Sequence, residues 1–167
     1  MIQKCSQWKV LRIFFLEPTR IHYIKEIARK IGLAHTSVKK HLLEIANEGL
    51  IKKTKGEIFS GYKADRENPE FIFYKKINNL IELKKSGIIE IIKERYPKSI
   101  ILFGSYEKGE DIETSDIDLF IDSKKFDIET EKLEKSLNRG IHIIFKGEES
   151  KSLSEGILQG TLLFGER

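Results

Sequence analysis

Two aspartates two positions apart, Asp116 and Asp118, are the residues of this chain best suited to chemistry. They lie in a short apolar stretch that predicts a strand. Because strand side chains alternate between faces, both carboxylates project to one side while Ile117 and Leu119 point into a core. Two carboxylates this close repel each other and disfavour folding unless a cation joins them. The pair therefore predicts a divalent metal site.

A Gly-Ser turn, Gly104-Ser105, stands just upstream, after the apolar residues Leu102 and Phe103 and before a short helical turn. Backbone N–H groups and a hydroxyl at such a turn suit an anion. The turn is not a P-loop, because no Gly-Lys-Ser/Thr follows it. With the aspartates, it predicts a site for a metal ion and a phosphate.

The elements that must position these residues alternate between strand and helix. The apolar patterns predict strands at 98–103, 141–145 and 161–164, and helices at 128–137 and 148–158. This alternation predicts an α/β or α+β sheet domain of about 80 residues.

The spacing of the motif resembles a known family. The motif consists of Gly104-Ser105, three residues, Gly109, five residues and then the run 115–119 (Ser-Asp-Ile-Asp-Leu). This pattern is similar to the signature of the minimal nucleotidyltransferases, relatives of DNA polymerase beta and kanamycin nucleotidyltransferase. The resemblance implies transfer of a nucleoside monophosphate from a nucleoside triphosphate, with ATP the expected nucleotide and pyrophosphate leaving. Under it, Asp116 and Asp118 would hold Mg²⁺ as catalytic residues.

The same resemblance assigns the phosphates to the turn and its surroundings. Lys108 stands where the family often has an arginine, and it supplies charge without a bidentate fork. The implied nucleotide-binding residues are Gly104, Ser105, Lys108, Gly109 and Ser115.

The family also places a third carboxylate on the next strand, and this chain departs from it there. The residue of suitable phase is His142, and the nearest acids, Glu148 and Glu149, lie beyond the strand. Imidazole is a poor ligand for Mg²⁺, but it can act as a base near neutral pH. Whether the domain is an enzyme is therefore left open: His142 is either a third catalytic residue or a residue of a site that only binds nucleotide.

The N-terminal part of the chain predicts a different fold. Apolar residues recur at helical spacing at 6–16, 24–31 and about 34–48. Strands are predicted at 50–54 and 58–63, with a turn at 55–57. This order of elements resembles the winged helix-turn-helix of prokaryotic transcription regulators. In that fold the third helix enters the major groove of double-stranded DNA. The implied DNA-binding residues are Thr36, Ser37, Lys39, Lys40, His41, Lys52, Lys53 and Lys55.

Charge divides the chain in the same way. Residues 1–85 carry 18 Lys and Arg against 9 Asp and Glu, a net +9, whereas residues 86–167 carry 12 against 17, a net −5. This asymmetry favours two modules with different partners, although solvated lysine-rich helices would give the same excess. We expect an α+β protein with a winged helix at 1–66, a helical connector at 67–96 and a nucleotidyltransferase-like domain at 97–167.

The remaining features of the sequence bear on the compartment in which the protein is found. No apolar run is long enough for a membrane span, the first residues lack the apolar core of a signal peptide, and Cys5 is the single cysteine. These features predict a cytoplasmic protein with no membrane partner. His22, His35 and His41 are interpreted as polar surface or turn residues, because no ligand cluster accompanies them.

Three functions fit these features. The first is a DNA-binding regulator whose second domain senses a nucleotide, and the second is an active nucleotidyltransferase brought to nucleic acid by its winged helix. The third is an antitoxin-type partner of a small helical toxin. A homodimer is expected for a regulator that reads two half-sites.

Overall fold

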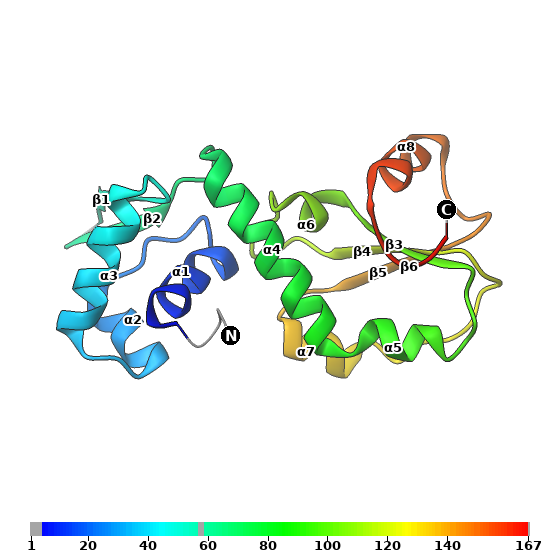
Figure 1. The fold of residues 1–167 in the computed structure, drawn as a ribbon, viewed down its shortest axis with the longest axis horizontal. Helices are drawn as coiled ribbons and strands as arrows, with labels where there is room; N and C mark the ends of the chain where they lie inside the picture. The colour runs from blue at the N-terminus through cyan, green and yellow to red at the C-terminus, as the bar shows by residue number, and fades with distance from the viewer. Residues whose placement is uncertain (1–4, 57–58, 167) are drawn as a thin grey trace. The chain divides into compact units, whose positions relative to one another are not determined.

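The computed structural model describes residues 5–56 and 59–166 of the chain. They form two compact units, 1–75 and 76–167, and the division falls within the long helix α4 (Pro69–Ser86) (Figure 1). The boundaries expected from the sequence, 1–66, 67–96 and 97–167, stay predictions.

Unit 1 begins with three helices, α1 (Ser6–Leu16), α2 (Ile24–Ile31) and α3 (His35–Asn47). Each buries the apolar stripe that its sequence predicts. The fully buried residues are Val10 and Phe14 of α1, Ile27 of α2 and Val38, Leu42 and Ile45 of α3. Burial of these stripes against one another, more than helix propensity, stabilises such short helices.

A two-stranded antiparallel hairpin follows, formed by β1 (Ile51–Lys55) and β2 (Ser60–Ala64). The loop between α1 and α2 adds one more antiparallel bridge to it. There, the N–H of His22 donates to the carbonyl of Tyr62 at 2.8 Å, and the N–H of Tyr62 donates back at 2.9 Å. The order of three helices and a hairpin is as predicted, but Glu57 and Ile58 of the predicted turn and strand lie outside the described residues. The winged-helix assignment stays a prediction.

The long helix α4 starts at a side-chain cap. The Asn68 Oδ1 accepts hydrogen bonds from the backbone N–H groups of Glu70 (2.8 Å) and Phe71 (3.3 Å). The Asn-Pro-Glu sequence predicts this start, because proline needs no hydrogen-bond acceptor at the first helical position. A turn at Ser86-Gly87 separates α4 from α5 (Ile88–Lys93).

Unit 2 is built on a four-stranded mixed sheet in the order β5-β4-β3-β6. β3 (Ser99–Phe103) pairs antiparallel with both β4 (Ile117–Ile121) and β6 (Thr161–Gly165), whereas β4 and β5 (Ile141–Phe145) are parallel. The mixture of helices and a mixed sheet confirms an α+β fold for this part of the chain.

Three further helices connect these strands. α6 (Gly104–Lys108) follows β3, α7 (Glu131–Leu137) lies between the parallel strands β4 and β5, and α8 (Lys151–Gln159) precedes β6. α7 and α8 each start three residues later than the sequence predicts. Ile128, expected in the helix, instead packs against the core from an irregular segment.

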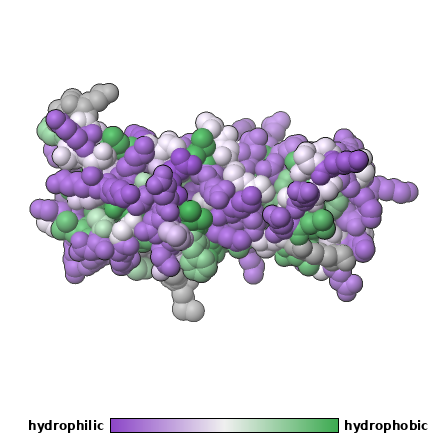
Figure 2. Space-filling model, turned by 90° about the horizontal axis from the view of Figure 1, so that it is seen from above, coloured by the Kyte–Doolittle hydropathy of each residue, from purple (hydrophilic) through white to green (hydrophobic). Residues whose placement is uncertain are grey.

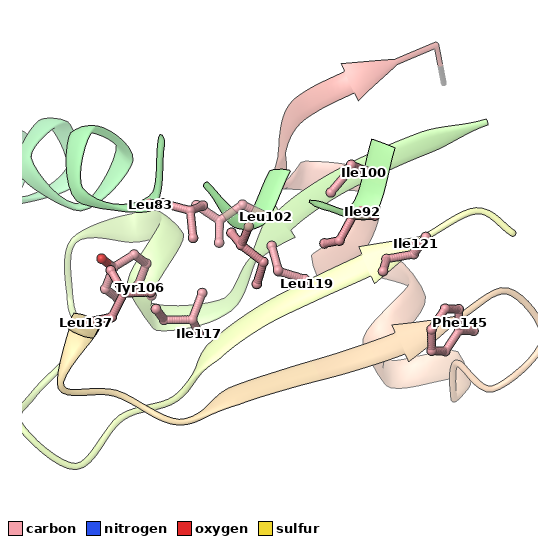
Figure 3. Packing of buried hydrophobic residues seen from close by; sticks show 11 residues of the cluster. Leu83, Ile92, Ile100, Leu102, Tyr106, Ile117, Leu119, Ile121, Leu137 and Phe145 are labelled. Carbon is pink, nitrogen blue, oxygen red and sulfur yellow. The ribbon is translucent and has the colours of Figure 1, made fainter. Parts of the chain in front are cut away.

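The two faces of the sheet carry different layers. One face is apolar, with Ile100, Leu102, Ile117, Leu119 and Ile121 fully buried against Leu83 and Ile92 (Figure 3). Ile88 belongs to the same cluster. On the other face, Ile101, Phe103, Phe120 and Ile144 pack under α8 through Ile157. Figure 1 shows α8 on the opposite side of the sheet from α5 and α7. Alternation therefore places Asp118 and His142 on the α8 face.

The face seen in Figure 2 is mostly hydrophilic, with apolar side chains in small separate groups, as a chain with 34% charged residues predicts. Among the helices of the described residues, none combines the length and the apolar character needed to cross a membrane.

His22, interpreted from the sequence as a polar surface or turn residue, is fully buried where the loop before α2 bridges to Tyr62. Its Nε2 lies 2.9 Å from the carbonyl oxygen of Glu17, and its ring packs edge-on against Phe14. Burial lowers the pKa of His22 below its ordinary 6.5, and the neighbouring Glu17 carbonyl and carboxylate only partly oppose this. Sequence spacing does not indicate this burial, since the bridge to Tyr62 joins residues far apart in the chain.

This burial predicts a pH dependence for unit 1. The unfolded chain takes up a proton at His22 before the folded chain does, so stability is full above pH 6.5 and falls as the pH drops toward the lowered folded pKa. The slope approaches about 1.4 kcal/mol per pH unit for one proton. Urea unfolding between pH 7 and 5, followed by the fluorescence of Trp8, would measure it.

The control is His22→Gln, which keeps a hydrogen-bonding side chain and removes the titration. The variant should be less stable at pH 7 and nearly independent of pH in this window. An equal slope in the variant and the wild type would refute the assignment.

Candidate functional site

The Gly-Ser turn lies where β3 ends and α6 begins. Phe103, the last residue of β3, pairs with Asp118 in β4, so the turn follows directly beside that aspartate. Gly104 has φ +80°, in the left-handed region that favours glycine. A Cβ at Gly104 would collide with Oδ2 of Asp118. Glycine is therefore required here by backbone conformation and by the close approach of a carboxylate.

The second aspartate rests against another glycine. Asp116 immediately precedes β4, it is exposed, and its Oδ1 occupies the space that a Cβ at Gly140 would take. Asp118 is half-buried, one step further along the same face of β4. The structure thus places both carboxylates on one face, as the alternation predicts, each against a residue without a side chain.

His142 stands beside Asp118. The two residues are register partners in the parallel pair β4–β5, and Nδ1 of His142 lies 3.0 Å from Oδ1 of Asp118. The His142 side chain is 57% exposed and that of Asp118 is 26% exposed. The Asp118 carboxylate is therefore shared, with Oδ1 at the imidazole and Oδ2 at the Gly104 turn.

The other predicted phosphate residues lie around α6. Ser105 is half-buried in its first turn, Lys108 is exposed at its last residue, and Gly109 ends the helix. The Ser115 hydroxyl accepts a hydrogen bond from the backbone N–H of Ile112 at 2.9 Å. In this structure Ser115 therefore shapes the turn that leads to Asp116.

The acids beyond β5 do not approach the aspartates as a third ligand. Glu148 pairs with Lys125 at 2.8 Å and accepts the N–H of Phe145, and these contacts lower the pKa of Glu148. Glu149 accepts the N–H of Gly147. In residues 5–56 and 59–166, no group of three or more His, Cys, Asp and Glu side chains is arranged to hold a metal ion.

The donors that are present suit one kind of ion. Mg²⁺ takes one or two carboxylates from a protein and completes its shell with water and substrate phosphates. Asp116 and Asp118 supply such carboxylates beside a turn whose glycine leaves room for a close approach. His142 adds a nitrogen that Mg²⁺ binds poorly. The residues fit Mg²⁺ held jointly with a triphosphate.

The predicted DNA-binding residues lie on α3 and the hairpin of unit 1. On α3, Thr36, Lys39 and Lys40 are exposed and Ser37 is half-buried. His41 is half-buried as well, and its Nδ1 lies 3.2 Å from the Glu44 carboxylate.

The hairpin lysines are exposed too. Lys53 and Lys55 lie on one face of β1 by alternation, whereas Lys52 lies on the other and pairs with Asp65 at 2.7 Å. This ion pair raises the pKa of Lys52. The charge of Lys52 is partly neutralised, so Lys53 and Lys55 are the more available hairpin cations.

Sequence reasoning missed Gly140 and the buried polar cluster of Asn79, Asp111 and Arg139. Gly140 was interpreted only as the start of the strand that carries His142. A buried Asp111 could not be distinguished from the exposed acids around it, because its partners are 32 and 28 positions away.

One comparison with known proteins gave a match. Residues 85–161 match the model of a family described as the nucleotidyltransferase domain. The matched stretch contains Gly104, Asp116, Asp118 and His142, so it supports the nucleotidyltransferase domain expected here. The predicted winged helix lies outside it. Searches of curated proteins and of solved structures gave no match.

The Gly104 contact predicts a stability difference between two alanine variants. Gly87 has the same φ of +80°, but nothing lies within 4 Å of the position of its Cβ. Gly87→Ala should therefore cost only the backbone strain, about 1–2 kcal/mol. Gly104→Ala should cost at least about 1 kcal/mol more, because it also displaces the Asp118 carboxylate. Urea unfolding of unit 2 would measure both, and equal losses would contradict the contact.

Proposed function

We propose that the C-terminal domain binds a nucleoside triphosphate with Mg²⁺ and transfers its nucleoside monophosphate to an acceptor, and that unit 1 binds double-stranded DNA. The observation that carries the first part is the Asp118 carboxylate held between the Gly104 turn and His142, with Asp116 on the same face. Two carboxylates beside a turn at which a helix begins suit a cation and the phosphates that it neutralises.

The residues of the site divide the work of the transfer. Gly104 and Ser105 bind the phosphates, and Asp116 and Asp118 hold the cation. Mg²⁺ held there would supply positive charge to the phosphate oxygens. In the transfer the acceptor hydroxyl attacks the α-phosphate, its proton passes to a base, and pyrophosphate leaves. Asp118 accepts a hydrogen bond from Nδ1–H of His142, so Nε2 can take the proton of the attacking hydroxyl.

A second candidate function is a nucleotide sensor that binds without transfer. It is favoured by one observation, which is that the neighbour of Asp118 on β5 is an imidazole rather than a carboxylate. A site with two acids can hold one cation with a triphosphate, but it lacks the third hard ligand on which a two-metal transfer depends.

Calorimetric titration with ATP tests the binding. ATP should bind in the presence of Mg²⁺, and Asp118→Asn should weaken binding at least about tenfold, because the cation loses a charged ligand. Asp122→Asn is the matched control, since Asp122 directly follows the last residue of β4 and pairs with Lys146. Absence of Mg²⁺-dependent binding in the wild type would rule the proposal out.

Transfer is tested separately with α-labelled triphosphates. Labelling of an acceptor that Asp116→Ala and Asp118→Ala abolish, and that His142→Ala strongly reduces, would establish the transferase. Binding without labelling would favour the sensor.

The DNA-binding part rests on charge and exposure. Lys39 and Lys40 project from α3, and Lys53 and Lys55 project from β1, in a half of the chain with a net charge of +9. Lysines contact phosphates as point charges, so they contribute affinity and salt dependence rather than base recognition. A protein-binding or dimerisation module would show no such salt dependence for DNA.

Duplex binding measured over a series of salt concentrations would check this. Lys39→Gln with Lys40→Gln should weaken binding and reduce the slope of log K against log salt by about 0.9 for each lost contact. Lys9→Gln with Lys30→Gln removes the same charge from α1 and α2 and should leave the slope nearly unchanged. No duplex binding at low salt would defeat the DNA assignment.

A further inference from the structure

Three buried polar side chains form a cluster beneath the segment that leads to Asp116. The side chains of Asp111 and Arg139 are only 1% and 3% exposed, and Nη2 of Arg139 lies 3.5 Å from Oδ2 of Asp111. Nδ2 of Asn79, on α4, donates to Oδ1 of Asp111 at 2.7 Å and to the carbonyl of Tyr106 at 2.9 Å. Both oxygens of the buried Asp111 carboxylate are thus engaged.

Arg139 also bonds to the backbone on two sides. Its Nη1 donates to the carbonyl of Glu113 at 3.2 Å and to the carbonyl of Asn138 at 2.9 Å. Asp111 and Glu113 belong to the irregular segment between α6 and β4, whereas Asn138 and Arg139 lead into β5. The Arg139 guanidinium therefore forms hydrogen bonds to both segments that lead into the parallel strands β4 and β5.

The residues that follow Arg139 and precede β4 lie against Asp116 on two sides. Gly140 follows Arg139 directly, its carbonyl accepts the N–H of Ile117 at 2.8 Å, and the Asp116 carboxylate fills the space beside its Cα. On the other side of Asp116, the Ser115 hydroxyl closes the turn at Ile112. Displacement of either segment would move the Asp116 carboxylate away from Gly140.

We infer that Arg139, paired with the Asp111 carboxylate that Asn79 also bonds, is a positioning residue that sets the place of the Asp116 carboxylate for cation binding. This inference rests on the proposed function of the site. A buried ion pair adds little net stability compared with apolar residues of the same volume. Partners behind a metal ligand, in contrast, change metal affinity strongly by orienting the ligand. Arg139 touches neither cation nor nucleotide and acts through Asp116.

The geometry requires arginine rather than any cation. The guanidinium reaches three acceptors: the Asp111 carboxylate, the Glu113 carbonyl and the Asn138 carbonyl. A lysine ammonium keeps the charge, but it lacks the rigid fork that holds all three in fixed directions. Arg139→Lys therefore preserves the charge of the cluster while loosening the tie between the two segments.

Cation binding by the full-length protein tests the inference, with Mn²⁺ as a paramagnetic probe and no nucleotide added. Arg139→Lys should raise the Kd for Mn²⁺ by about tenfold or more. Asp111→Asn, which can still accept a hydrogen bond from Asn79, should also raise it, and it provides a second variant if Arg139→Lys does not fold.

Lys76→Met is the matched control, because it removes a different ion pair of the same unit, Lys76–Glu107 at 2.6 Å, which does not include either aspartate. It should reduce stability without changing the Kd for Mn²⁺. An unchanged Kd in folded Arg139→Lys and Asp111→Asn would overturn the inference, and so would an equal rise in Lys76→Met.

A second readout separates this inference from the proposed function. If the wild type binds neither Mn²⁺ nor ATP with Mg²⁺, the proposed function fails, and amide hydrogen exchange then decides the positioning. The Ile117 N–H, which bonds to Gly140, should exchange faster in Arg139→Lys than in Lys76→Met. Equal exchange in the two variants would overturn the positioning role.

Discussion

The antiparallel register between β3 and β4 is the constraint on which the rest of the site depends. Because Phe103 pairs with Asp118, the chain leaves β3 beside that carboxylate, and only a residue without a side chain fits there. Gly104 supplies both the space and the left-handed backbone with which α6 starts. The Gly104 turn and the Asp118 carboxylate are thus fixed by one pair of strands, which the buried apolar face of the sheet holds in register.

The pairing of β4 with its other neighbour, β5, is the second constraint on the site. Parallel pairing with β5 places His142 opposite Asp118 and Gly140 next to Asp116, so each aspartate meets a different environment. Asp118 is half-buried and hydrogen-bonded, whereas Asp116 is exposed. The site combines a carboxylate with fixed partners and a carboxylate whose place depends on the segments that lead to it. An imidazole in place of a third acid leaves fewer hard ligands, which is why nucleotide binding is the better supported part of the proposal.

Much of the fold was predictable because it follows from local periodicity. The helices of unit 1, the capped start of α4 and the strands β3, β5 and β6 all lie within a residue or two of the positions predicted from apolar spacing. The errors fall where apolar spacing is weak. α7 and α8 start later than expected, since Ile128 packs on the core from an irregular segment and Glu148 bonds to the N–H of Phe145 at the end of β5. His22 was interpreted as a polar surface or turn residue, and its burial was missed because it depends on neighbours that sequence spacing does not reveal.

Strand alternation and the backbone freedom of glycine are local properties, so the amino-acid sequence is enough to predict that Asp116 and Asp118 share a face and that a glycine turn precedes them. The residues that meet these carboxylates depend on the folded chain. Asp118 lies against Gly104 and His142, and Asp116 lies against Gly140 above the cluster of Asp111 and Arg139. These contacts join strands and loops through register and packing, and such pairings between distant residues leave no periodic signal in one chain. The motif therefore predicts a site for a cation and phosphates, while the folded sheet decides which residues surround the two carboxylates.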